Sequence, residues 1–159
     1  NNNPVVAVLE QAVEACPTAE MYLASIQFLQ SSQDKEYPLA IHKLLIQAKD
    51  KEISSPSLTI LEADMLVQEG KLEAAMDTLE QACLQNKDDE TNDVRLWLQW
   101  ARLCDLSNDT NTTAPPSHVL TMALERTPLT NGKEQMMISL QLFGALLKEA
   151  TRRTNSSNN

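Results

Sequence analysis

The sequence has little of what turn-rich, phosphate-binding or nucleic-acid-stacking proteins need. Three glycines in 159 residues are too few for a turn-rich β architecture or a phosphate-cradling loop. Aromatic residues make up only 4%, which disfavours a stacking platform for single-stranded nucleic acid. No apolar run approaches the roughly 18 residues that a membrane-spanning helix needs. We therefore expect no association with a membrane.

Positive charge is scarce as well. Acidic residues outnumber basic ones by 22 to 13, which gives a formal net charge of −9. A protein that binds nucleic acid through its surface normally carries a basic footprint. We therefore expect any RNA contact to be indirect or local, and we expect no small-molecule substrate.

The residues that could carry chemistry do not form a coherent set. Cys16, Cys83 and Cys104 are odd in number and widely spaced, which predicts reduced, buried thiols in an intracellular protein. His42 and His118 have no cysteine or histidine at metal-ligand spacing. Cys104 and His118 could suggest a catalytic cysteine with a histidine base, but the sequence offers no third group to orient the histidine. We therefore do not interpret them as a catalytic pair. We predict no catalytic residue, no metal site, no cofactor and no enzymatic activity.

What the sequence does contain is helical periodicity along almost its whole length. Hydrophobic residues make up 42%, enough to bury a core, and their spacing predicts helices and no strand. The expected helices cover about residues 5–16, 19–30, 37–50, 56–69, 71–85, 117–126 and 133–153, and another runs through Leu96, Trp97, Trp100 and Leu103. The polar, proline-ended stretch 107–116 predicts an inserted loop, and 154–159 predicts a disordered tail. The fold class is therefore all-α.

An internal repeat is the most informative feature. Val8-Leu9-Glu10-Gln11-Ala12 returns as Thr78-Leu79-Glu80-Gln81-Ala82, and more loosely as Val119-Leu120-Thr121-Met122-Ala123. Leu9, Ile41, Leu79 and Leu120 occupy related apolar positions. The intervals between them are 32, 38 and 41 residues. A helix pair repeated at such a period predicts an α-solenoid, because one hairpin cannot bury its apolar face alone.

Several of these positions carry a family resemblance. The spacing of Ala63, Gly70, Ala75, Leu79 and Ala82 resembles the small and apolar positions of the tetratricopeptide repeat (TPR), which let the two helices of a hairpin approach closely. The segment that contains Trp97 and Trp100 resembles the first helix of the HAT (half-a-TPR) repeat. The segments that contain Tyr22 and Phe143 resemble it less, since each keeps one ring.

The resemblance implies an α-α superhelix of about four HAT/TPR-like repeats over residues 1–153. The expected repeat core is Leu9, Ala12, Tyr22, Ala63, Gly70, Ala75, Leu79, Ala82, Trp97, Trp100, Leu120, Ala123 and Phe143. The array starts on a second helix and ends on a first helix, with no obvious polar cap. This phase predicts a piece of a longer repeat protein.

The resemblance also implies a function. HAT repeats occur as scaffolds in RNA-processing machines, so we expect a non-catalytic scaffold that binds other proteins of a large ribonucleoprotein complex. Pre-ribosomal RNA processing in the nucleus, within the nucleolus, is the first expectation, with splicing and mRNA 3′-end processing as alternatives. A cytoplasmic TPR-type peptide-binding adaptor or co-chaperone is the third. Candidate partner contacts are Arg95 and Arg102 on the best first helix, and Arg152 and Arg153 near the carboxyl end.

Overall fold

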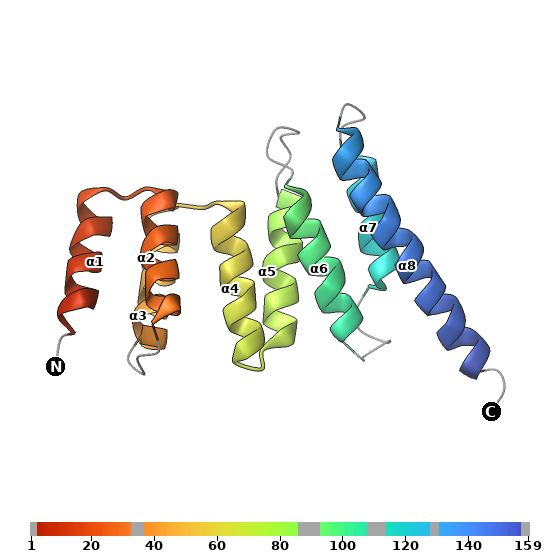
Figure 1. The fold of residues 1–159 in the computed structure, drawn as a ribbon, viewed down its shortest axis with the longest axis horizontal. Coiled ribbons are helices and arrows are strands. Elements are labelled where there is room, and N and C mark those ends of the chain that lie inside the picture. Colours follow the sequence, from red (N-terminus) through yellow and green to blue (C-terminus); the bar gives the residue numbers. More distant parts are fainter. Residues whose placement is uncertain (1–2, 33–36, 86–92, 108–113, 128–130, 157–159) are drawn as a thin grey trace. The chain divides into compact units, whose positions relative to one another are not determined.

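The computed structural model describes residues 3–32, 37–85, 93–107, 114–127 and 131–156, and every regular element in them is an α-helix. Figure 1 shows the ribbon. The helices are α1 (Pro4–Ala15), α2 (Ala19–Ser31), α3 (Tyr37–Asp50), α4 (Pro56–Gln68), α5 (Leu72–Gln85), α6 (Val94–Leu106), α7 (Pro116–Arg126) and α8 (Gly132–Ser156). The all-α prediction is confirmed for this part of the chain.

The chain divides into two compact units. Unit 1 comprises residues 1–62 and unit 2 residues 63–159, so the division falls inside α4. We expected one continuous array over residues 1–153. The structure shows two groups of packed helices, and the continuous array stays a prediction.

Unit 1 is built on α2, which packs against both α1 and α3. Its helices begin where the sequence supplies caps: the Asn3 side chain accepts from the Val5 amide, and the Thr18 hydroxyl from the Met21 amide. Across the unit, the Lys43 ammonium of α3 lies 2.8 Å from a Glu10 carboxylate oxygen of α1. The core consists of Val13, Tyr22, Ile26, Leu29, Tyr37, Ala40, Ile41, Leu44, Leu45, Ala48, Leu58 and Leu61.

Unit 2 is built on α6, which packs against α5, α7 and α8. The largest side chain buried in its core is Trp97, which is 1% exposed. The centroid of the Trp97 ring lies 5.7 Å from that of the Trp100 ring. The Arg126 guanidinium covers the Trp97 ring at 5.7 Å and also donates to the Cys83 carbonyl at 3.2 Å. This contact joins α7 to α5, the two helices on either side of α6 in sequence.

Two other pairs of alternate helices in unit 2 are also joined by polar contacts. The Gln99 amide of α6 donates to Asp64 of α4 at 2.6 Å, and the Lys148 ammonium of α8 lies 2.9 Å from Asp105 of α6. The helices α5, α6 and α7 each pack against the next one along the chain, and alternate helices also contact through polar side chains. This pattern is consistent with an α-helical repeat.

Gly70 has a different role from the one we expected. It is exposed, has φ +76°, and an added Cβ would meet nothing within 4 Å. The Lys71 amide donates to the Leu66 carbonyl and the Gly70 amide to the Val67 carbonyl, which is a Schellman turn that ends α4. Gly70 therefore serves the turn between α4 and α5, and the prediction that it allows close helix packing was wrong.

The predicted boundaries agree with the helices to within a few residues, and α3 matches at both ends. The largest difference is at α8, which continues to Ser156. Residues 154–156 are thus helical, where we expected the disordered tail to begin. Residues 157–159 and most of the predicted 107–116 loop lie outside the described residues.

Candidate functional site: a groove between α6 and α8

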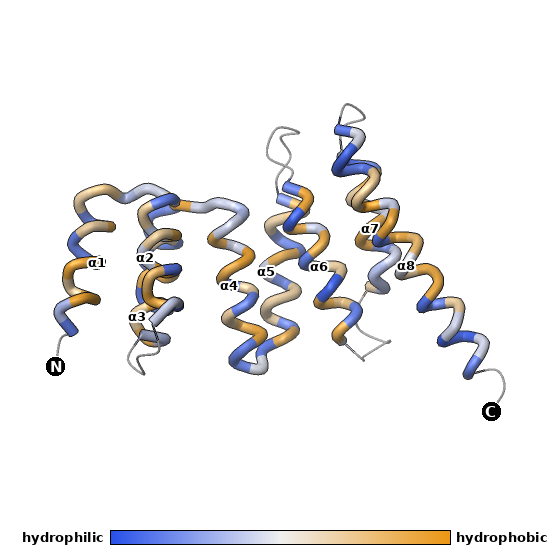
Figure 2. Tube along the Cα trace, viewed as in Figure 1, coloured by the Kyte–Doolittle hydropathy of each residue, from blue (hydrophilic) through white to orange (hydrophobic). Residues whose placement is uncertain are grey.

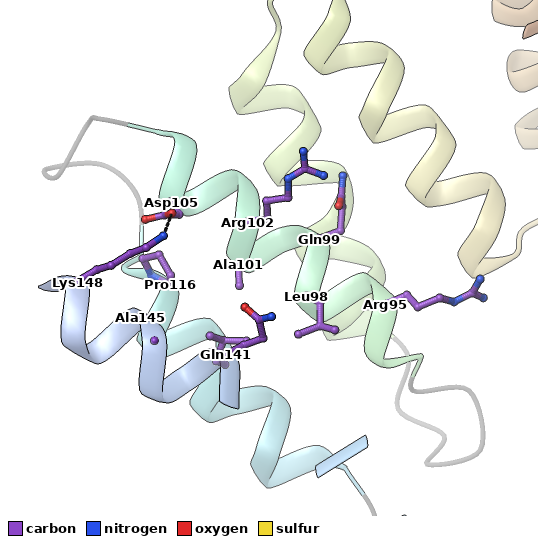
Figure 3. A pocket seen from close by; sticks show the side chains of 12 residues that line it. Arg95, Leu98, Gln99, Ala101, Arg102, Asp105, Pro116, Gln141, Ala145 and Lys148 are labelled. Atoms are coloured by element: carbon purple, nitrogen blue, oxygen red, sulfur yellow. Dashed lines mark hydrogen bonds and ion pairs between the residues drawn. The ribbon is translucent and has the colours of Figure 1, made fainter. Parts of the chain in front are cut away.

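Unit 2 contains a groove of about 480 Å³ between α6 and α8, with α7 beneath it (Figure 3). We call it the α6/α8 groove. Its volume lies within the range of roughly 300–1,000 Å³ that is usual for ligand sites. The lining residues are Arg95, Leu98, Gln99, Ala101, Arg102, Asp105, Pro116, Leu120, Gln141, Gly144, Ala145 and Lys148.

The α6 side of the groove follows from helical periodicity. Arg95, Leu98, Arg102 and Asp105 recur at intervals of three and four residues, so they share one face of the helix. The opposite face carries Trp97 and the rest of the core. Packing that core therefore turns the polar face of α6 toward the groove.

The floor of the groove is apolar and made of small side chains. Ala101 of α6 is 5% exposed and Leu120 of α7 is 2% exposed. Opposite them lie Gly144 and Ala145 of α8, and a Cβ added at Gly144 would meet nothing within 4 Å. Small residues on both walls leave the space unfilled. Leu98 and Gln141 point into that space in Figure 3.

An ion-pair cluster closes one end. Asp105 of α6 accepts from Lys148 at 2.9 Å and from Arg152 at 3.3 Å, both on α8. The hydrogen bond from Lys148, together with the two positive charges, holds the pKa of Asp105 below its ordinary value. Lys148 and Arg152 are exposed and Asp105 is half-buried, so the cluster positions the walls rather than adding much stability.

The two arginines of α6 that line the groove differ in their pairing. Arg95 is bound by Asp93, with 2.6 Å between Nη2 and Oδ2, and this hydrogen bond lowers the pKa of Asp93. Arg102 is exposed and, within the residues that the structure describes, makes no hydrogen bond or ion pair. The groove thus has one arginine available for an external carboxylate.

The α7/α8 hairpin holds the second wall. The Ser117 hydroxyl donates to a Glu149 carboxylate oxygen at 2.9 Å, and the Ser117 amide donates to the other oxygen at 3.3 Å. Ile138, completely buried, anchors α8 on the apolar side. These contacts place Gly144 and Lys148 opposite α6.

The predicted partner contacts fall in different places. Arg95 and Arg102 line the groove, and Arg152 lies at its closed end on Asp105. Arg153 is exposed on α8 and does not line it. The sequence analysis missed Asp105 and Gln141. Asp105 follows Arg95, Leu98 and Arg102 at helical spacing, so that face of α6 carried a usable signal.

The predicted repeat core is buried in most positions. Tyr22, Ala63, Ala75, Leu79, Trp97, Trp100, Leu120 and Ala123 are buried, and Leu9, Ala12 and Ala82 are half-buried. Phe143 is 64% exposed, which contradicts its assignment to the core. It lies on the side of α8 away from α7, because Ile138 occupies the packed side.

The thiols and imidazoles lie apart from the groove. Cys83 and Cys104 are buried free thiols, whereas Cys16 is exposed, so the prediction that it is buried was wrong. Cys16 caps the end of α1, beyond the turn that contains the buried Val13. His42 and His118 are both exposed. In the described ranges, no three His, Cys, Asp or Glu residues are grouped so as to hold a metal ion.

Two further results complete the description. Across the described ranges, no helix combines the length and the apolar character needed to cross a bilayer. No protein-family model, curated protein or solved structure matches this chain.

Proposed function

We propose that this chain is a non-catalytic helical-repeat scaffold whose α6/α8 groove binds an acidic segment of a partner protein. The observation that carries the proposal is the groove itself, with an apolar floor and a positively charged rim. Its lining contains three cations, Arg95, Arg102 and Lys148, against one carboxylate, Asp105. A partner carboxylate would pair with Arg102, and an apolar side chain beside it would lie on Ala101 and Leu120.

The cellular setting rests on the resemblance to HAT repeats. Within that family, the sequence resembles the carboxy-terminal repeats of a small-subunit processome protein associated with the U3 small nucleolar RNA. We therefore place the scaffold in pre-ribosomal RNA processing, in the nucleolus, with other proteins of that assembly as partners. Splicing and mRNA 3′-end processing are the alternative assemblies.

A second candidate function is a TPR-type peptide-binding adaptor or co-chaperone in the cytoplasm. The unpaired Arg102 favours it, because such adaptors bind peptide carboxylates with basic side chains on their first helices. The two candidates share the groove and differ in the identity of the partner.

The test is affinity capture from nuclear and cytoplasmic extracts, with proteins identified by mass spectrometry. Wild type is compared with Arg102→Glu, which reverses a charge on the rim, and with Leu98→Gln, which replaces an apolar side chain that points into the groove by a polar one. Lys51→Glu is the matched control, since it makes the same charge change at an exposed position of unit 1. We expect both groove variants to lose partners that the control retains, and added salt to weaken their capture.

The identity of the lost partners decides between the candidates. Pre-ribosomal factors support the first, whereas chaperones or trafficking proteins replace it with the second. Equal capture by wild type and both groove variants would show that the groove is not the binding surface. We also expect the isolated chain to bind RNA weakly, and a submicromolar RNA affinity that falls steeply with salt would overturn the scaffold proposal.

A further inference from the structure

The face of α8 directed away from α7 is apolar and exposed. Met136, Leu140, Phe143 and Leu147 are 64%, 63%, 64% and 54% exposed, although all four are large hydrophobic side chains. We call these four residues the α8 seam. Figure 2 shows the hydrophobic stretch in the middle of α8, between hydrophilic ends. Isolated exposed side chains are normal, but four in one row on one helix mark an interaction surface.

The spacing of the seam is that of paired helices. Its residues follow each other at intervals of four, three and four, which is the heptad pattern of a two-stranded coiled coil. Ile138, which anchors α8 to unit 2, lies on the opposite side of the helix. A second helix can therefore lie along the seam without disturbing the core.

The seam is complementary to a reversed copy of itself. In an antiparallel pair, Leu140 of one copy meets Phe143 of the other, and Met136 meets Leu147, so four layers form from two kinds of contact. The flanking positions also match in size. Met137 comes opposite Gly144, where an added Cβ has open space, and Leu146 comes opposite Ser139. Placing large side chains against small ones is how paired helices pack closely.

Charge favours a copy of the chain over a charged partner. The two carboxylates of α8, Glu134 and Glu149, are partly buried and lie off the seam, and Glu149 already accepts from Ser117. No charged residue occurs between Met136 and Leu147. A charged partner helix would therefore bury groups that this face cannot pair, whereas a second copy would bury none in these layers.

We propose that the α8 seam is a self-association surface on which two copies of the chain pair their α8 helices antiparallel. Such a contact has two-fold symmetry, with the same patch used by both copies. One short helix pair buries less than the roughly 1,200 Å² of a standard interface, so the dimer is weak and reversible. The net charge of −9 opposes it, so salt strengthens it by screening the repulsion between copies.

The first experiment is sedimentation equilibrium of the whole chain over the micromolar range, at low and at high salt. We expect wild type to form a dimer whose dissociation constant falls as salt rises. Leu140→Gln and Phe143→Gln should each raise that constant at least tenfold without shifting the unfolding midpoint, because both positions are exposed. Leu39→Gln is the matched control, since Leu39 is 79% exposed on α3, and should leave the constant unchanged.

Outcomes of this experiment separate the proposal from that of the groove. A wild-type monomer at every concentration, or Leu140→Gln and Phe143→Gln variants that dimerise like wild type, would overturn self-association. Neither result bears on partner capture by Arg102. Loss of dimer in Arg102→Glu but not in Phe143→Gln would show that the groove, and not the seam, joins the copies.

Disulfide cross-linking tests the antiparallel register. In a Cys16→Ser background, which removes the exposed thiol, Leu140→Cys and Phe143→Cys proteins are oxidised separately and as a mixture. The proposed register brings residue 140 of one copy against residue 143 of the other, so the mixed dimer should exceed both homodimers. An excess of either homodimer over the mixed dimer would overturn the antiparallel arrangement.

Discussion

Units 1 and 2 are both built from packed α-helices, but their interiors differ in how well polar groups are satisfied. In the part of the chain that the structure describes, three buried side-chain atoms lack a hydrogen-bond partner: Tyr22 Oη, Ser25 Oγ and Gln47 Oε1. All three belong to unit 1. In unit 2 the side chain of Arg126, which is exposed overall, makes two contacts: its guanidinium lies over the Trp97 ring and donates to the Cys83 carbonyl.

The difference has an energetic meaning. A buried polar atom without a partner costs about 1–3 kcal/mol, because folding removes its hydrogen bonds to water and returns none. Unit 1 therefore carries a desolvation cost that is not found among the described residues of unit 2. Buried apolar area alone would not reveal this, since both units contain fully buried large side chains. We expect unit 1 to be the less stable of the two for the apolar surface it buries.

The aromatic residues allow the two units to be followed separately. Both tyrosines, Tyr22 and Tyr37, lie in unit 1, and both tryptophans, Trp97 and Trp100, lie in unit 2. In chemical unfolding, tyrosine absorbance thus reports on unit 1 and tryptophan fluorescence on unit 2.

The largest expected effect comes from a cavity in either core. Leu79→Ala in α5 should lower the free energy of unfolding of unit 2 by about 3 kcal/mol, because Leu79 is completely buried. Leu44→Ala in α3, at 1% exposure, is the matched variant for unit 1. Each should shift mainly the transition of its own unit in chemical unfolding. Equal shifts of both signals in either variant would show that the chain unfolds as one body.

A smaller effect distinguishes the units at alkaline pH. Burial raises the pKa of the Cys83 thiol from 9.0 to about 12 and that of Cys104 to about 11, and both thiols lie in unit 2. The folded state therefore keeps protons that the unfolded state releases above pH 9. Unit 2 should lose on the order of 1 kcal/mol for each thiol by pH 10, while these thiols cost nothing below pH 9.

Tryptophan-monitored unfolding between pH 8 and pH 10 measures this loss. Cys16→Ser is the control, since Cys16 is exposed and belongs to unit 1, and it should not change the loss in unit 2. The Cys83→Ala, Cys104→Ala double variant should be less stable at neutral pH and lose less as the pH rises. A double variant with the wild-type alkaline loss would assign that loss to other groups.

The comparison also shows what sequence could and could not predict. Helix positions followed from apolar spacing, prolines and caps, which are local, so α3 was predicted at both ends. Which side of α8 is buried does not follow from local sequence. Apolar residues occur on two of its sides, Ile138 on one and Phe143 on the other, and periodicity alone does not say which one meets α7. The sequence analysis assigned Phe143 to the core because of its aromatic ring. In the structure Ile138 is buried and Phe143 is exposed.

The groove was predictable only in part for a similar reason. Arg95 and Arg102 stood out as the basic residues of one helix, because they share a face of α6. The contact between Asp105 and Lys148 joins residues 43 positions apart, so it depends on how α8 packs beside α6. The role of Gly70 was also not predictable from the sequence pattern. Its small size suggested close packing, whereas its positive φ serves a turn, and at the end of α3 Glu52 adopts φ 56° in a similar turn.

The smallest expected effect tests the unsatisfied polar atoms of unit 1 directly. Ser25→Ala in α2 removes a hydroxyl whose oxygen is buried without a partner, and alanine also favours the helix. The variant should raise the free energy of unfolding of unit 1 by about 1 kcal/mol, since the desolvation cost disappears. Tyrosine absorbance measures the change, because both tyrosines remain.

Ser31→Ala supplies the control on the same helix. The Ser31 hydroxyl is exposed and donates to the Phe28 carbonyl at 2.7 Å, so its removal should give no gain. A gain confined to Ser25→Ala assigns the cost to the unpaired hydroxyl, because helix propensity alone would favour both variants. If Ser25→Ala gained nothing, its hydroxyl would be hydrogen-bonded in solution, and the contrast between the two interiors would rest on Tyr22 and Gln47 alone.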